Sequence, residues 1–98
     1  MIACRFAFRE WFGLRPAEAD LLVSLFEANG ALVKSHVLAA MAKVSPPSVP
    51  VLLVRLRSAL ETEAIDCERG RGYRLTEIGL AECRNALRAL CDELSGAC

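Results

Sequence analysis

The chain has 98 residues, which is enough for a single hydrophobic core and too few for two. Hydrophobic residues make up 54% of it, yet charges break every apolar run well before the ~20 residues that a membrane span requires. Twelve basic and twelve acidic residues give a net charge of zero, whereas dedicated nucleic-acid binders more often carry a positive surplus. We therefore expect a cytoplasmic protein without a membrane contact, whose apolar surplus indicates a partner subunit.

The cysteine and histidine content argues against catalysis and metal binding. Five cysteines are many for this length, but none are spaced as Cys-x-x-Cys, and no signal peptide precedes the first. This favours reduced thiols that behave as small hydrophobes over disulfides. The single histidine, His36, is isolated, the acids are scattered, and no nucleophile–base pair is present. We expect no metal, no cofactor and no enzymatic activity, with His36 as a solvated surface group.

The N-terminal third predicts a strand and a helix. Residues 2–8 carry aromatic residues at alternate positions and predict a short strand, followed by Trp11 and Phe12 as core anchors. A helix is expected next, because Pro16 suits a first turn and Gly30 suits a left-handed cap after the last turn. Its apolar face comprises Leu21, Leu22, Leu25 and Phe26.

A second, shorter helix is expected over residues 35–43. Ser35 is its predicted N-cap, and Val37, Leu38 and Met41 are predicted to face inward. The short apolar segment 31–33 before it is suited to add one strand to a hairpin further along the chain.

The third helix is expected from about Ser48 to Glu61, after a turn stiffened by two prolines. Ser48 can serve as its N-cap, since Pro50 is tolerated only in the first turn. The predicted core stripe comprises Val49, Leu53, Leu56 and Leu60. Arg55 and Ser58 then point outward, and the flanking faces carry Val51, Leu52 and Val54.

A basic hairpin follows between Ile65 and Leu75, with Gly70 and Gly72 at its turn. Tyr73 is expected to pack under the sheet. The arginines of this segment are Arg69, Arg71 and Arg74. They either solubilise an edge hairpin or contact phosphates, and three of them in six residues favours phosphate contact, above all by Arg71.

The C-terminal segment predicts a further helix over residues 77–94, capped by Thr76. Its apolar residues recur at intervals of three and four, as in a heptad a/d stripe: Leu80, Cys83, Leu87, Leu90 and Leu94. The stripe either packs onto the chain's own core or forms the interface of a homodimer. The homodimer is favoured because the core already has three helices. We accordingly divide the chain into a domain at 1–76 and a dimerisation element at 77–98.

Three motifs resemble those of the OmpR/PhoB-type winged-helix effector domain of response regulators. They are Leu14-x-Pro16-x-Glu18-x-x-Leu21-Leu22, Val49-x-Val51-x-Leu53-x-Arg55-Leu56-Arg57-x-x-Leu60 and Ile65-x-x-x-Arg69-Gly70-x-Gly72-Tyr73-x-Leu75. The resemblance covers about residues 12–76. It implies a mainly α, α+β winged helix-turn-helix fold, with a three-helix core and a C-terminal hairpin wing, that binds operator DNA. The helix at 77–94 would be an addition to it.

The departures from the family pattern leave two functions open. Leu52 and Val54 stand where the family's third helix presents polar residues to bases, Pro47 replaces a basic residue, and no receiver domain is present. The leading hypothesis is a dimeric regulator that binds double-stranded DNA. Its predicted contacts are Ser48, Val51, Leu52, Arg55, Arg57, Ser58, Arg69, Arg71 and Arg74. The alternative is a module that binds a protein partner through the apolar face of the third helix, without base readout.

Overall fold

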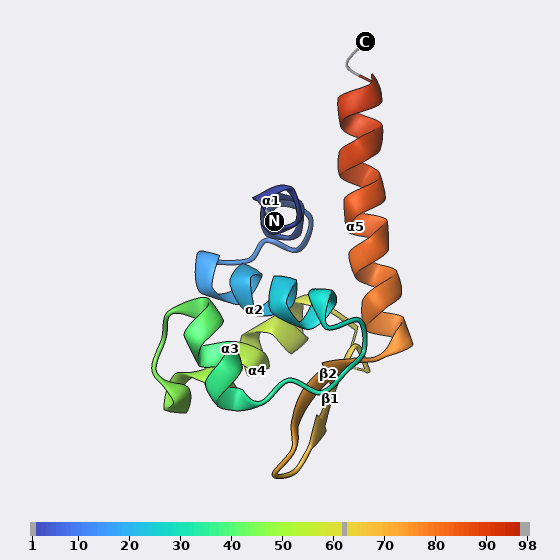
Figure 1. The fold of residues 1–98 in the computed structure, drawn as a ribbon. Coiled ribbons are helices and arrows are strands. Elements are labelled where there is room, and N and C mark those ends of the chain that lie inside the picture. Colours follow the sequence, from blue (N-terminus) through green and yellow to red (C-terminus); the bar gives the residue numbers. More distant parts are fainter. Residues whose placement is uncertain (1, 62, 97–98) are drawn as a thin grey trace.

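The computed structural model describes residues 2–61 and 63–96. The elements in chain order are α1 (Ile2–Phe12), α2 (Pro16–Glu27), α3 (Ser35–Ala42), the 3-10 turn η1 (Pro46–Ser48), α4 (Val49–Ala59), β1 (Ile65–Glu68), β2 (Gly72–Leu75) and α5 (Glu77–Gly96). The two strands form one antiparallel sheet (Figure 1). The expected class, α+β and mainly α, is confirmed.

Helix α2 is the centre of the core, because it contacts α1, α3, α4 and β2. It begins at Pro16, and the carboxylate of Glu18 accepts a hydrogen bond from the Arg15 backbone N–H at 3.3 Å, which satisfies a donor that precedes the first turn. Leu21, Leu22 and Leu25 are fully buried. This helix and its apolar face agree with the sequence prediction.

The strand predicted for residues 2–8 is wrong, since α1 occupies this segment. Cys4, Ala7 and Phe8 are buried at helical spacing, in contact with α2 and α5. The ring of Phe8 meets that of Phe26 edge-on, with centroids 5.6 Å apart. Trp11 lies away from this stripe and is 56% exposed, so it is not the core anchor that we expected.

Helix α3 is shorter and less buried than predicted. Its N-cap position is Lys34, so Ser35 lies inside the first turn and makes no capping hydrogen bond through its side chain. Leu38 is buried against the core, but Val37 and Met41, which we expected to face inward, are exposed. The eight-residue helix buries only one narrow stripe because α2 and α4 cover a single side of it.

Helix α4 has the core stripe that the sequence predicts. Val49, Leu53, Leu56 and Leu60 are buried, and the helix follows η1 directly. Ser48 occupies the N-cap position in a helical conformation, and its hydroxyl lies 3.0 Å from that of Ser45 instead of capping the helix. The prolines of η1 therefore set the start of α4, not a serine side chain.

The hairpin, residues 65–75, pairs in the register Ile65↔Leu75 to Glu68↔Gly72. Segment 31–33 adds a single bridge and not a full strand: the Val33 N–H donates to the Tyr73 carbonyl at 2.7 Å, and the Tyr73 N–H donates back at 2.9 Å. Tyr73 is half-buried against the core, close to expectation. This bridge fixes the hairpin beside the start of α3.

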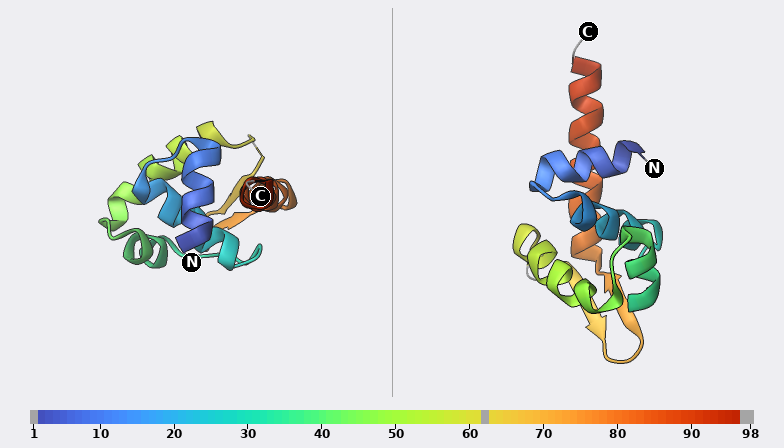
Figure 2. Two further views of the ribbon diagram at one scale, coloured as in Figure 1. Left: turned by 90° about the horizontal axis from the view of Figure 1, so that it is seen from above. Right: turned by 90° about the vertical axis from the view of Figure 1, so that its left-hand side faces the viewer.

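Helix α5 begins with the predicted cap, since the Thr76 hydroxyl accepts a hydrogen bond from the Gly79 N–H at 3.3 Å. Leu80, Cys83 and Ala86 are buried in the common core. The helix then rises past α1, and its end lies opposite the hairpin turn (Figures 1 and 2), which gives the molecule extents of 48 × 25 × 21 Å.

Among the residues that the structure describes, no single helix has the length and apolar content needed to cross a membrane. By those two criteria alone, the pair Ser35–Ala42 and Pro46–Ala59, bent by 97°, would pass.

Candidate nucleic-acid interface

The outward face of α4 carries Val51, Val54, Arg55 and Ser58, which are all exposed. Their spacing of three, one and three residues places them on one side of the helix, opposite the core stripe. Val51 and Val54 expose 55% and 63% of their surface. Leu52, which we expected among the base-facing residues, is instead half-buried and packs against the core. This face is therefore mainly apolar, with one arginine and one hydroxyl.

Arg55 lies beside a buried acid of the neighbouring helix. Its Nη1 is 4.0 Å from Oε2 of Glu18, whose side chain is only 7% exposed, whereas 54% of the Arg55 side chain is exposed. A nearly buried carboxylate needs a compensating cation, and Arg55 is the cation within reach. Glu18 thus orients the guanidinium and offsets part of its charge, while much of the guanidinium stays in contact with solvent.

Two arginines of the hairpin are paired with acids of the same hairpin. The guanidinium of Arg74 donates two hydrogen bonds to Oδ2 of Asp66, at 3.0 and 3.2 Å, across the sheet. Arg71 lies 3.5 Å from the carboxylate of Glu68. Arg69 is exposed and has no ion-pair partner among the side chains that the structure describes. The cationic surface is therefore weaker than the count of arginines suggests.

Two further predicted contact residues, Arg57 and Ser48, are only partly exposed. Arg57 is half-buried, and its Nε is enclosed without a hydrogen-bond acceptor in the described part of the chain. Ser48 is half-buried, with its hydroxyl next to that of Ser45. Neither side chain extends the outward face of α4.

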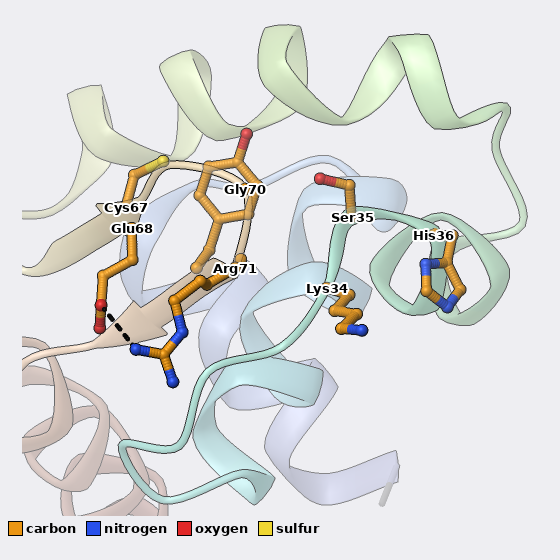
Figure 3. A pocket seen from close by; sticks show the side chains of 9 residues that line it. Lys34, Ser35, His36, Cys67, Glu68, Gly70 and Arg71 are labelled. Atoms are coloured by element: carbon orange, nitrogen blue, oxygen red, sulfur yellow. Dashed lines mark hydrogen bonds and ion pairs between the residues drawn. The ribbon is translucent and has the colours of Figure 1, made fainter.

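A groove of about 360 Å³, the hairpin groove, separates the start of α3 from the hairpin. Its lining comprises Lys34, Ser35, His36, Cys67, Glu68, Gly70, Arg71, Gly72 and Tyr73. Figure 3 shows Arg71 on the hairpin side, beside Glu68, and Lys34 and His36 on the α3 side. Ammonium, guanidinium and hydroxyl groups around one groove are suited to contact an anion.

The sequence interpretation missed Lys34 and left His36 as a surface group. His36 is indeed exposed, but it also lines the hairpin groove. The signal was present in the apolar segment 31–33: a bridge from Val33 to the hairpin brings the next residues, Lys34 to His36, alongside it.

The predicted dimerisation stripe is only partly available. Leu80 and Cys83 are buried in the chain's own core, so their assignment to a dimer interface is wrong. Leu87 is half-buried against the same core, whereas Leu90 lines a groove between α1 and α5. The side chain of Leu94 lies outside the described residues. The division at residue 76 does not separate two cores.

Comparison with protein-family models found no match, and comparisons with curated proteins and with solved structures found none either. Within the described residues, no group of three or more histidine, cysteine, aspartate and glutamate side chains is arranged to hold a metal ion.

Proposed function

We propose that this chain is a small winged-helix DNA-binding transcriptional regulator. Helix α4 enters the major groove and the hairpin, as the wing, lies along the backbone or in the minor groove. The observation that carries the proposal is that α4, with its exposed outward residues, and the arginine-bearing hairpin both lie at the end of the molecule away from the C-terminus (Figure 2). Exposed groups on a helix and on an adjoining hairpin match the two contact elements of this class of domain.

The contacts divide by chemistry. Arg69 and Arg71 on the hairpin, with Arg55 on α4, supply cations for phosphates. Val51 and Val54 are suited to the methyl groups of thymine but not to the bidentate hydrogen bonds that identify guanine or adenine. We therefore expect modest sequence discrimination, with most of the affinity from the backbone.

The chain's own ion pairs do not prevent phosphate binding. The pair of Arg71 with Glu68 is exposed on both sides, with 71% and 42% of the side chains accessible. Exposed pairs of this kind contribute about 0–1 kcal/mol, so a phosphate can replace the carboxylate at little cost. Arg74, held by two hydrogen bonds to Asp66, is the hairpin arginine least free to turn toward DNA.

A salt titration with a mixed-sequence duplex tests the proposal. We expect the logarithm of the binding constant to fall with the logarithm of salt concentration, and Arg71→Ala to reduce that slope by about one. Arg88→Ala, an exposed arginine on α5, is the matched control and should leave the slope unchanged. Absence of binding at low salt overturns the proposal.

A second candidate is a winged-helix module that binds a protein, favoured by the exposed apolar side chains of α3 and α4 and by the zero net charge. These side chains are Val37, Met41, Val51 and Val54. Val54→Arg separates the two in the same titration. It adds a cation to the outward face of α4 and should strengthen binding to the duplex, whereas it should abolish docking of an apolar protein surface.

A further inference from the structure

A second groove, of about 420 Å³, lies between α1 and α5, and we call it the α1–α5 groove. Its lining comprises Phe6, Ala7, Glu10, Trp11, Ala86, Ala89 and Leu90. Phe6 and Trp11 leave 51% and 56% of their surface exposed, although aromatic side chains contribute most when they are buried. We propose that a second copy of this chain covers this groove and forms a two-fold homodimer through α1 and the distal half of α5.

The first argument is the continuity of the apolar stripe on α5. The stripe is covered by the body at Leu80 and Cys83 and is half-buried at both Leu87 and Leu90, and Leu90 lines the groove. Figure 1 shows why, since α5 continues past the body and only α1 lies alongside it there. An apolar helix face that extends from a covered to a partly covered region, with exposed aromatics beside it, is suited to association with another chain.

The second argument is that the surface near the groove carries both an acidic and a basic side chain, so that two copies of this surface can pair opposite charges. Glu10 lines the α1–α5 groove, and Arg9 lines an adjoining hollow that shares Phe6 and Glu10 with it. Both side chains are exposed, and neither has an ion-pair partner in the described part of the chain. A two-fold interface brings the same surface of both copies together, so it must be complementary to itself. A surface with one acid and one base meets this condition, because Arg9 of each copy can face Glu10 of the other.

The third argument is position. The residues that line the α1–α5 groove belong to α1 and to α5 beyond the body, and these parts of the two helices lie away from the hairpin turn (Figures 1 and 2). A ligand on α4 and the hairpin therefore leaves the groove open, and a dimer through the groove leaves α4 and the hairpin of each copy accessible. This interface differs from the predicted stripe in that it uses Phe6 and Trp11 and excludes Leu80 and Cys83.

The sole tryptophan is part of the proposed interface, so it reports association directly. Light scattering should give a mass of twice 10.7 kDa, and Trp11 emission should shift to shorter wavelength as the protein concentration rises. Phe6→Glu and Leu90→Glu should each give a monomer with unshifted emission. Met41→Glu, which charges an exposed apolar residue of α3, is the matched control and should remain dimeric. Circular dichroism verifies that each variant is folded.

Charge exchange supplies a test that misfolding cannot imitate. Arg9→Glu and Glu10→Arg should each weaken the dimer by about fivefold, since an exposed ion pair changes affinity by less than tenfold. The double variant, with both charges exchanged, should restore it. A wild-type protein that stays monomeric at every concentration, or a dimer that Phe6→Glu and Leu90→Glu leave intact, overturns the inference. Duplex binding by Phe6→Glu is measured in parallel, so the failure of the dimer and the failure of DNA binding are distinguishable.

Discussion

The two buried cysteines show how a reactive residue type serves as core. Burial raises the pKa of the Cys83 thiol from 9.0 to about 12, and the Glu82 carboxylate and the Cys4 thiol add smaller upward effects. Burial also raises the pKa of Cys4. Both side chains are buried, which agrees with the expectation of cysteines that act as small hydrophobes, whereas Cys67 and Cys91 are exposed and do not fit it. Cys98 lies outside the described residues.

The raised pKa of Cys83 predicts a loss of stability in alkali. Between pH 9.0 and about 12 the thiol ionises in the unfolded chain but stays protonated in the native protein. The unfolded state then binds fewer protons, so the free energy of unfolding falls as the pH rises, by up to about 1.4 kcal/mol per pH unit. Urea unfolding across this range should give a steeper fall for the wild type than for Cys83→Ala. Parallel curves for the two proteins would contradict the assignment.

At the scale of elements, periodicity predicted the buried faces of α2 and α4 because each has an unbroken stripe. The N-terminal segment failed because it fits two periods: Phe6 and Phe8 alternate as in a strand, while Cys4 and Phe8 are spaced as in a helix. Packing against α2 and α5 stabilises the helical conformation of this segment and leaves Phe6 exposed. That choice depends on contacts far away in the sequence, which a local pattern does not contain.

In the candidate nucleic-acid interface, too, some contacts could be predicted from the sequence and others could not. The pair of Asp66 and Arg74 follows from the hairpin register and could have been predicted, since the two residues stand directly opposite across the sheet. The proximity of Glu18 to Arg55 joins α2 to α4 and depends on how the two helices pack. The sequence therefore indicated where the arginines lie but not how much of their charge is offset.

Gly72 fixes the position of the hairpin, and we expect a substitution of Gly72 to displace the hairpin. Its φ is +132°, and a Cβ there would lie 2.4 Å from the Val33 carbonyl oxygen. Gly72→Ala should break the bridge between Val33 and Tyr73 and destabilise the fold by about 2–4 kcal/mol. Gly70→Ala is the control: φ is +77°, but the Cβ meets nothing within 4 Å, so only about 1 kcal/mol should be lost. Chemical denaturation of both variants measures the difference, and equal losses would show that the bridge does not hold the hairpin.

For the whole molecule, α5 is part of the single core and not an appendage. Its first half contributes Leu80, Cys83 and Ala86 to the cluster that also contains Phe8 and Leu75. Gly79 allows the close approach, since a Cβ there would lie 2.3 Å from the Ala64 carbonyl oxygen. The body and the base of α5 should therefore unfold in one cooperative transition, as small single-core domains do.

Truncation distinguishes this single core from two independent parts. A chain that ends at Thr76 loses three buried side chains of α5, and Leu80 alone should contribute about 2–5 kcal/mol, within a total stability of about 5–15 kcal/mol. We expect it to lack a cooperative thermal transition. A chain that ends at Asp92 keeps every α5 residue with a described buried or half-buried side chain, so it should melt within a few degrees of the full chain. A cooperative transition in the shorter chain would show that residues 1–76 fold by themselves.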